Sequence, residues 1–374
     1  MLPYGRQSID RSDVEAVLAA LGSDWLTTGP RVAQFEADVE AVAGAPAVTV
    51  TNGTTALHTA YAAAGVGPGD EVVTTPMTFV ATASCANLLG ATVIFADVED
   101  ETANLDPAAV EAVATARTRV IAAVDYAGHP AEYDPLRKIA ERVDAVLVGD
   151  AAHAIGSTYH GRPVGTLADL TTFSFFPTKN LTTAEGGAVA STRPDLLARA
   201  RTFRNIGMVR EPDRLRNPDE GGWYYEVQSF GLNFRLPDLL CALGSSQLAR
   251  LADFKAARQR LTARYDELLA DVPGLRLPVQ RDGVDPMRHL YPVRVLDGRR
   301  REVYDRLRAA GIGVQVNYIP VYWHPVYQDL GYRRGMCPVA EAFYAEQLSL
   351  PLFVDLTDAD QDRVVESLRH ILGS

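Results

Sequence analysis

An aspartate and a lysine are the two residues whose surroundings best suit them to chemistry. Asp150 ends the apolar run AVLVGD, and Lys179 follows 29 residues later, one crossover further along, in SFFPTKNLTTAEGG. Burial among apolar and small residues lowers the pKa of a lysine and favours Schiff-base chemistry. Taken singly, an aspartate after a strand is often a helix N-cap, and a lone lysine is usually a solvated surface charge. Together they indicate a carboxylate and an amine that reach the same crevice.

Two further segments add an anion site and an aromatic cover. In TNGTTALH, Gly53 and Thr54 connect an expected strand to a helix. Their exposed N–H groups, the hydroxyl and the helix dipole together suit a phosphate monoester. Phe79, in TTPMTFVATAS after the next strand, could cover a flat heterocycle at the same edge of the sheet. A capped helix without a ligand and a phenylalanine in the core are the respective alternatives.

These four features converge on pyridoxal 5′-phosphate (PLP). The cofactor needs an amine for a Schiff base, a phosphate cradle, a ring to cover its plane and a carboxylate at its pyridine nitrogen. The carboxylate keeps that nitrogen protonated, so that the ring can accept electrons from a substrate carbanion. A chance convergence of all four is much rarer than any single alternative.

Alternating strands and helices are expected to position these residues. Between the expected strands lie helical stretches at 54–64, 80–89, 107–114 and 135–143, which favours a mostly parallel sheet with helices on both faces. Ligands of such sheets bind beyond the carboxyl ends of the strands. The seven β-branched runs expected to form strands are 46–50, 71–75, 92–96, 119–124, 145–149, 170–175 and 187–191.

The remainder of the chain predicts a long loop and a second, smaller unit. Residues 205–230 are rich in Gly, Pro and charge, as in a long functional surface loop. A long helix from Pro237 to about Leu269 follows, then strands at 290–295 and 313–318 and helices near 301–310, 338–348 and 357–372. We therefore expect a large PLP-binding domain with an N-terminal arm over 1–236. A long connecting helix and a small C-terminal α+β domain are expected over 237–374.

Composition narrows the class of protein and its partners. The chain has 374 residues, 47% hydrophobic and 22% charged, which excludes disorder, collagen and coiled coils. A net charge of −11 disfavours nucleic acid as the main partner. Cys85, Cys241 and Cys337 lie far apart without CxxC spacing, so neither disulfides nor a metal site is expected. Without a signal sequence or a long apolar stretch, the protein is expected to be cytoplasmic and without membrane partners.

The motifs quoted above resemble those of the fold type I PLP enzymes, specifically the DegT/DnrJ/StrS sugar aminotransferases. The likeness spans nearly the whole chain and is most specific where DAAHA and TKNLTTAEGG occur at this spacing. It implies that Lys179 forms the internal aldimine with PLP and that pyridoxamine phosphate is the intermediate form. It also implies that Asp150 pairs with the pyridine nitrogen, and that Phe79 stacks on the ring with His153 nearby. Gly53, Thr54 and Ser174 look like the phosphate ligands.

Family members are homodimers whose active sites are completed across the interface, so the resemblance also assigns residues to that interface and to the substrate. Asn233, in GLNFRL, matches the residue that the neighbouring subunit contributes. Three positions depart from the family pattern near the expected substrate: Ser84 replaces a frequent Asn, and Phe176 and Asn317 replace frequent histidines. The substrate contacts that the resemblance implies are Tyr4, Trp25, Thr27, Asn317 and Tyr318.

The implied reaction moves an amino group from L-glutamate to the 4-keto group of a UDP- or dTDP-linked 4-keto-6-deoxy sugar. His153 resembles the 4-aminotransferase pattern, whereas many 3-aminotransferases carry Gln there. A 3-keto sugar, a ketocyclitol and, remotely, a non-catalytic regulator with the same fold stay open as alternatives. Arg210, Arg214 and Arg216 could supply positive charge for the diphosphate from the 205–230 loop, or could be solvated loop charges.

Overall fold

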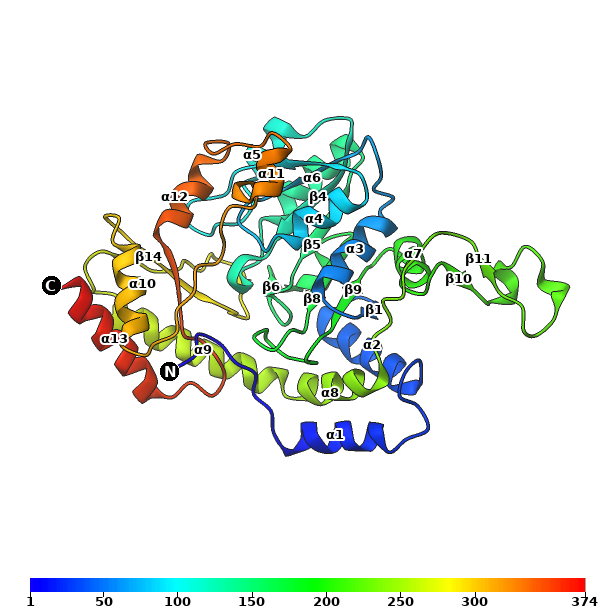
Figure 1. The fold of residues 1–374 in the computed structure, drawn as a ribbon, viewed down its shortest axis with the longest axis horizontal. Coiled ribbons are helices and arrows are strands. Elements are labelled where there is room, and N and C mark those ends of the chain that lie inside the picture. Colours follow the sequence, from blue (N-terminus) through cyan, green and yellow to red (C-terminus); the bar gives the residue numbers. More distant parts are fainter. Residues whose placement is uncertain (374) are drawn as a thin grey trace.

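A computed structural model describes residues 1–373, so the last residue of the predicted second domain lies outside the described part. Its centre is a seven-stranded sheet (Figure 1). Only β9 runs antiparallel to its neighbours, while β2, β3, β4, β5 and β8 pair in parallel. All seven strands expected from the sequence are confirmed. In spatial order they are β1 (Ala47–Val50), β9 (Gly187–Ala190), β8 (Leu170–Ser174), β5 (Val146–Asp150), β4 (Thr118–Val124), β2 (Glu71–Thr74) and β3 (Thr92–Phe95).

Helices cover both faces of this sheet because successive strand side chains point to opposite sides. Val72 and Val73 of β2 enter different core clusters, as do Leu147 and Val148 of β5. The cluster with Val72 packs under α3 (Gly53–Ala63), α4 (Ala81–Leu88) and α7 (Pro194–Arg204). The opposite cluster packs under α2 (Pro30–Ala43), α5 (Pro107–Val113), α6 (Tyr133–Val143) and α8 (Asp238–Ala249).

A third core cluster lies in the C-terminal part of the chain. It joins α9 (Leu251–Leu269), α10 (Arg300–Ala309) and α13 (Asp358–Leu372) to a small antiparallel sheet. The N-terminal Leu2 also belongs to this cluster and forms a β-bridge with Ile312. The division of the chain after residue 236 stays a proposal. The small sheet contains β12 (Leu275–Arg276), β14 (Tyr291–Val295) and β15 (Gln347–Leu350).

Two expectations for the C-terminal part were wrong. The expected long helix is two helices, α8 and α9, because the backbone of Arg250 between them leaves the helical region at φ −106° and ψ 7°. Residues 313–318 do not form a strand, and only Gln315 bridges to Ser349. The N–H of Asn317 instead donates to the Gln347 side chain and its carbonyl accepts from Tyr126, so neither group is left for a strand partner.

Further elements were not anticipated from the sequence. Near the N-terminus, α1 (Arg11–Leu21) packs along α8 (Figure 1). A second small sheet combines β13 (Val284–Asp285), β6 (Thr158–Tyr159) and β7 (Arg162–Pro163). In the C-terminal part, α11 (Pro325–Asp329) is also unanticipated, whereas α12 (Pro338–Glu346), which precedes β15, confirms the helix expected near 338–348. Within residues 1–373 we find no helix long and apolar enough to cross a membrane.

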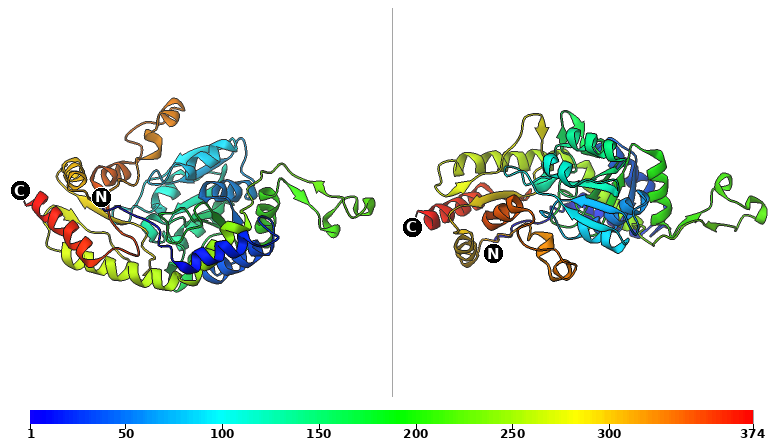
Figure 2. Two further views of the ribbon diagram at one scale, coloured as in Figure 1. Left: turned by 60° about the horizontal axis from the view of Figure 1, so that its bottom comes forward. Right: turned by 90° about the horizontal axis from the view of Figure 1, so that it is seen from above.

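The 205–230 segment is an arm that projects from the body. It contains the short hairpin β10 (Met208–Val209) and β11 (Glu226–Val227), which extends well beyond the other elements in three views (Figures 1 and 2). Several large apolar side chains on or beside it are exposed, with Trp223 at 78% and Phe230 at 99%. Such a surface is typical of a segment that contacts another molecule.

Candidate active site

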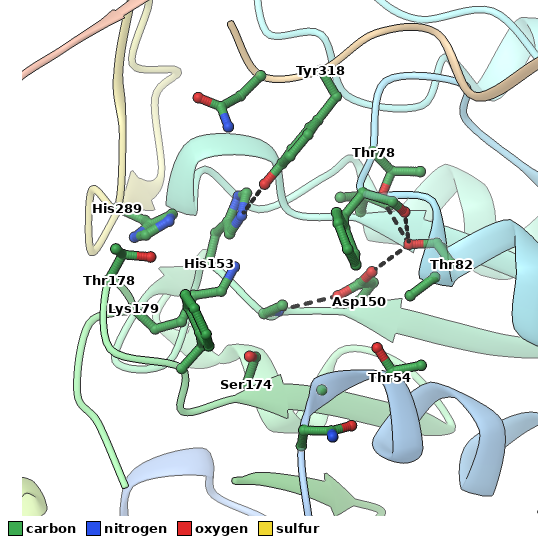
Figure 3. Close-up of a pocket in the computed structure, with 18 of the residues that line it drawn as sticks. Thr54, Thr78, Thr82, Asp150, His153, Ser174, Thr178, Lys179, His289 and Tyr318 are labelled. Atoms are coloured by element: carbon green, nitrogen blue, oxygen red, sulfur yellow. Dashed lines mark hydrogen bonds between the residues drawn. The ribbon is translucent and has the colours of Figure 1, made fainter. Parts of the chain in front are cut away.

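A cavity of about 460 Å³ opens at the carboxyl ends of the parallel strands, where the topology predicts a ligand site. Most of the residues singled out from the sequence come together there (Figure 3). Those that line it are Tyr4, Gly53, Thr54, Phe79, Asp150, His153, Ser174, Lys179, Asn317 and Tyr318. Trp25, Thr27 and Asn233 do not line the cavity of their own chain.

Asp150 ends β5 and is buried at the floor of the cavity. The Thr82 hydroxyl donates to Asp150 Oδ2 over 2.7 Å, and the Ala152 N–H donates to Oδ1 over 3.2 Å. Burial raises the pKa of Asp150, while these two bonds and Lys179 oppose that rise. A buried carboxylate held by donors on one side is suited to face a cation on the other.

Lys179 follows a tight turn at the end of β8, where its N–H donates to the Phe176 carbonyl over 2.8 Å. Burial lowers the pKa of Lys179 to about 8, although the Asp150 charge opposes this. Roughly a tenth of the amine is therefore neutral at pH 7, far more than for an ordinary lysine, and is able to act as a nucleophile or a base. The surface-charge reading of this lysine is wrong.

The start of α3 and the end of β8 form the anion cradle. Asn52 caps the helix by accepting the Thr55 N–H over 2.9 Å, and the first-turn N–H groups of Gly53 and Thr54 have no intrahelical partner. A Cβ added to Gly53 would lie 2.8 Å from the Ser174 Cβ, so only glycine allows this close approach. The hydroxyls of Thr54 and Ser174 lie around the same space (Figure 3). This neutral cradle fits a phosphate, and with Lys179 the set fits PLP.

Two neighbouring histidines, with their rings tilted against each other, form another wall of the cavity. His153 Nδ1 accepts the Ala127 N–H over 3.3 Å, so its Nε2 carries the proton and donates to the Tyr318 hydroxyl over 3.0 Å. The His289 ring lies 4.4 Å from that of His153, centre to centre. Burial lowers the pKa of both histidines well below the usual range, so both are neutral. The sequence reasoning missed His289, because a single histidine before a strand carries no distinctive pattern.

Asn317 and Tyr318 are held from behind by a buried hydrogen-bond network. Asn317 Oδ1 accepts from the Ser349 hydroxyl over 3.0 Å, and Ser349 in turn accepts from Gln347. Tyr318 contacts Phe79 edge to face, with ring centres 6.4 Å apart. Phe176, noted above as a departure near the expected substrate, also lines the cavity, and the residues that sequence reasoning did not single out are Asn52, Leu57, Thr78, Ala81, Thr82, Val124, Ala152, Thr178, Glu185 and Gln315. Thr78 and Thr82 flank Phe79 in TTPMTFVATAS, which is the one signal that could have found them.

The described lining of the cavity is poor in positive charge. Lys179 faces Asp150 and Glu185, and no arginine is among the lining residues within 1–373. The arm arginines do not reach this cavity, because the hairpin projects away from the body. Arg214 pairs with Glu211 over 3.4 Å, and the Arg210 guanidinium lies 5.1 Å from the Tyr225 ring centre. An anionic substrate therefore needs cations from outside this chain's own cavity.

Comparison with known proteins agrees with this geometry. The model of the DegT/DnrJ/EryC1/StrS aminotransferase family matches residues 7–369. The chain belongs to this family. It is therefore a PLP-dependent aminotransferase of fold type I, as the sequence motifs implied.

Relatives of this aminotransferase match along their whole length. The spore coat polysaccharide biosynthesis protein SpsC of Bacillus subtilis is 38% identical, with 99% of this chain and 97% of SpsC covered. The UDP-4-amino-4,6-dideoxy-N-acetyl-beta-L-altrosamine transaminase of Campylobacter jejuni is 36% identical, with 100% and 98% covered. Among solved structures, Spr1654 from Streptococcus pneumoniae in its PMP form superposes with a TM-score of 0.94 at 30% identity, covering 100% of this chain and 99% of its own.

Proposed function

We propose that this aminotransferase moves an amino group from L-glutamate to the 4-keto group of a nucleotide-linked 4-keto-6-deoxy sugar, carried on UDP or dTDP. The observation that carries the proposal is that half-buried Lys179 and buried Asp150 line one cavity beside a neutral phosphate cradle. The Campylobacter relative, named as a UDP-4-amino sugar transaminase, supports the sugar and its position. The product would be a 4-amino sugar for glycan or natural-product biosynthesis.

The residues of the cavity that were singled out from the sequence as cofactor contacts each have a part in this proposal. When bound, PLP supplies an electron sink for the carbanion formed at the reacting carbon. Asp150 holds a proton at the pyridine nitrogen, and Phe79 covers the ring. Lys179 would hold the cofactor through its amine and would move the proton at the substrate carbon as general base and then acid. Gly53, Thr54 and Ser174 bind the phosphate, and His153 lies beside the ring.

The same proposal requires a homodimer with shared active sites. The cavity is lined by one lysine and two acidic side chains, whereas the carboxylates of glutamate and the diphosphate of the nucleotide both need cations. Arg235 is half-buried and donates to Asn205 Oδ1 over 2.8 Å, without a carboxylate partner among the described residues. With Asn233, Trp25 and Thr27, it would complete the cavity of the partner. The projecting arm, with Arg210, Arg214 and Arg216, would reach across in the same way.

Other ketones remain the second candidate. A 3-keto nucleotide sugar or a ketocyclitol would meet the same cofactor apparatus, and only His153 and the Campylobacter relative favour position 4. A non-catalytic regulator is disfavoured, because Lys179 is present and the chain belongs to an aminotransferase family.

The test is a half-reaction with defined ketones. The protein is loaded with pyridoxamine phosphate and mixed with a panel of 3-keto and 4-keto nucleotide sugars and ketocyclitols. Recovery of the PLP absorbance identifies the amino acceptor, and we expect it only with the 4-keto-6-deoxy sugars. Recovery with a ketocyclitol or a 3-keto sugar alone would refute the proposed position. The Lys179→Ala variant is the control that should give no recovery with any ketone.

A further inference from the structure

Phe176 is a large apolar side chain that is left open to the cavity. Its side chain lines the cavity and the residue is 46% exposed. Phe173 and Phe175, by contrast, are completely buried, and the Phe175 ring packs on Phe35 at 5.4 Å. The alternation continues past the end of β8, so that Ser174 and Phe176 face the cavity while Phe173 and Phe175 face the core. The exposure of Phe176 thus follows from the strand register.

The Phe176 ring is only half covered by the chain itself. Phe79, the other exposed phenylalanine of the cavity, is supported by Tyr318. Phe176 has no such ring partner among residues 1–373. A half-exposed phenyl group lacks part of the hydrophobic stabilisation that burial would give it, unless a ligand covers it. The ring therefore indicates an apolar part of a ligand on this side of the cavity.

The position of Phe176 favours contact of its ring with the amino acceptor rather than with the amino donor. Its carbonyl accepts the Lys179 N–H, so the ring belongs to the same turn as the reacting amine. Glutamate brings two carboxylates, which gain nothing from a phenyl ring, and the cofactor plane already has Phe79. A deoxy sugar, in contrast, offers a methyl group and apolar C–H faces to an aromatic ring.

We infer that Phe176 is a specificity-determining residue that packs against the C6 methyl group of the acceptor sugar. This inference rests on the proposed function, since it concerns the sugar of that reaction. A methyl group in a fitted apolar pocket discriminates by about 10- to 200-fold. The enzyme should therefore favour 6-deoxyhexoses over pentoses, which lack C6, by at least about ten-fold.

A matched pair of unreactive ligands tests the inference without turnover. UDP-6-deoxyglucose and UDP-xylose differ only in the C6 methyl group, and the corresponding dTDP sugars form a second pair. Dissociation constants are measured by calorimetry on the pyridoxamine phosphate-loaded protein. For the wild type we expect the deoxyhexose to bind at least about ten-fold more tightly. Phe176→Ala should reduce this ratio to near one, and Phe176→Leu should keep part of it.

Controls separate the inference from folding and from the proposed function. Leu330→Ala removes an apolar side chain that is 61% exposed and outside the cavity lining, and it should keep the wild-type ratio. If both sugars bind but Phe176→Ala and Phe176→Leu keep that ratio, the inference fails while the proposed function stands. If no nucleotide sugar binds the wild type, the proposed substrate class fails and the inference fails with it.

Discussion

Thr82 lies in the first turn of α4, and its hydroxyl donates a 2.7 Å hydrogen bond to Asp150 Oδ2 at the end of β5. Removing a hydrogen bond to a charged group costs roughly 1.5–3 kcal/mol, or about 10- to 100-fold in an equilibrium constant. We therefore expect Thr82→Val to weaken PLP retention by about that factor, because the ionised Asp150 loses a donor. Equilibrium dialysis against PLP measures it. Thr82→Ser keeps the hydroxyl and should restore tight binding.

The close approach of Gly53 to Ser174 gives a steric prediction. In Gly53→Ala, the new Cβ would fall 2.8 Å from the Ser174 Cβ and push the two sides of the cradle apart. We expect PLP affinity to fall by more than about ten-fold, since several phosphate hydrogen bonds depend on this spacing. Gly67→Ala is the matched control, because an added Cβ there meets nothing within 4 Å. Equal losses in both variants would refute a role for the cradle.

The lowered pKa of Lys179 predicts how PLP uptake depends on pH. Only the neutral amine attacks a carbonyl, and burial places the pKa of Lys179 at about 8. In the cofactor-free protein, the rate of PLP uptake should thus rise with pH and level off above about 8. Stopped-flow absorbance at each pH measures this rate. A midpoint near 10.5, the ordinary lysine value, would show that the Lys179 amine is not desolvated in solution.

Asp125 lies beside the cavity and gives a prediction about stability. Its Oδ1 accepts from the Ala131 N–H and the Tyr133 hydroxyl, whereas its buried Oδ2 has no partner among the described atoms. Burial raises the pKa of Asp125 from 3.8 to about 7. Between these values the folded protein binds a proton that the unfolded chain has lost. The free energy of unfolding should therefore fall by up to about 1.4 kcal/mol per pH unit from this group as pH rises toward 7.

Asp125→Asn mimics the protonated acid and should remove this dependence. Denaturant unfolding at pH 5 and pH 8 measures the difference, which should be smaller in the variant than in the wild type. Asp282→Asn changes an exposed aspartate and serves as the control for the loss of a charge. An unchanged pH dependence in Asp125→Asn would mean that Asp125 is ionised in the folded protein.

Shared active sites can be tested by subunit complementation. Lys179→Ala inactivates the cavity of its own chain, and Asn233→Ala should impair only the cavity of the partner. In a two-fold dimer with shared sites, each cavity combines Lys179 of one chain with Asn233 of the other, so a mixed dimer contains one fully native cavity. When equal amounts of the two variants re-pair at random, about half of the dimers are mixed and one of their two cavities is native, so about a quarter of wild-type activity should return. If mixing restores nothing while each variant remains dimeric, Asn233 acts within its own chain.

The sequence predicted the sheet well, because each strand is a short β-branched run between helical stretches. Asp150, Ser174 and Lys179 could be expected near one another for the same reason, since they lie at or just beyond the ends of those strands, and all three line the cavity. Tertiary contacts decided what the sequence missed. Residues 313–318 read as a strand, yet Gln347 and Tyr126 use the backbone groups of Asn317.

His289 and the two helices before β1 were also missed, because they depend on contacts between residues far apart in the sequence. His289 reaches the cavity only because its N–H donates to the carbonyl of Ala127, far away in the sequence. The first two helices pack on α8, which follows them by some 200 residues, and their own sequences carry weak apolar stripes. Contacts at such separations are invisible to local patterns.

The path of the first four residues has a practical consequence. Leu2 hydrogen-bonds to Gly311 and Gly313, and Tyr4 reaches the cavity while its carbonyl accepts from the Leu352 N–H. Met1, only three positions earlier, is 79% exposed. A preparation trimmed by a few residues would lose a wall of the cavity and part of the C-terminal core together. Intact mass should therefore be checked before activities from different preparations are compared, and an affinity tag placed before Met1 needs a long spacer.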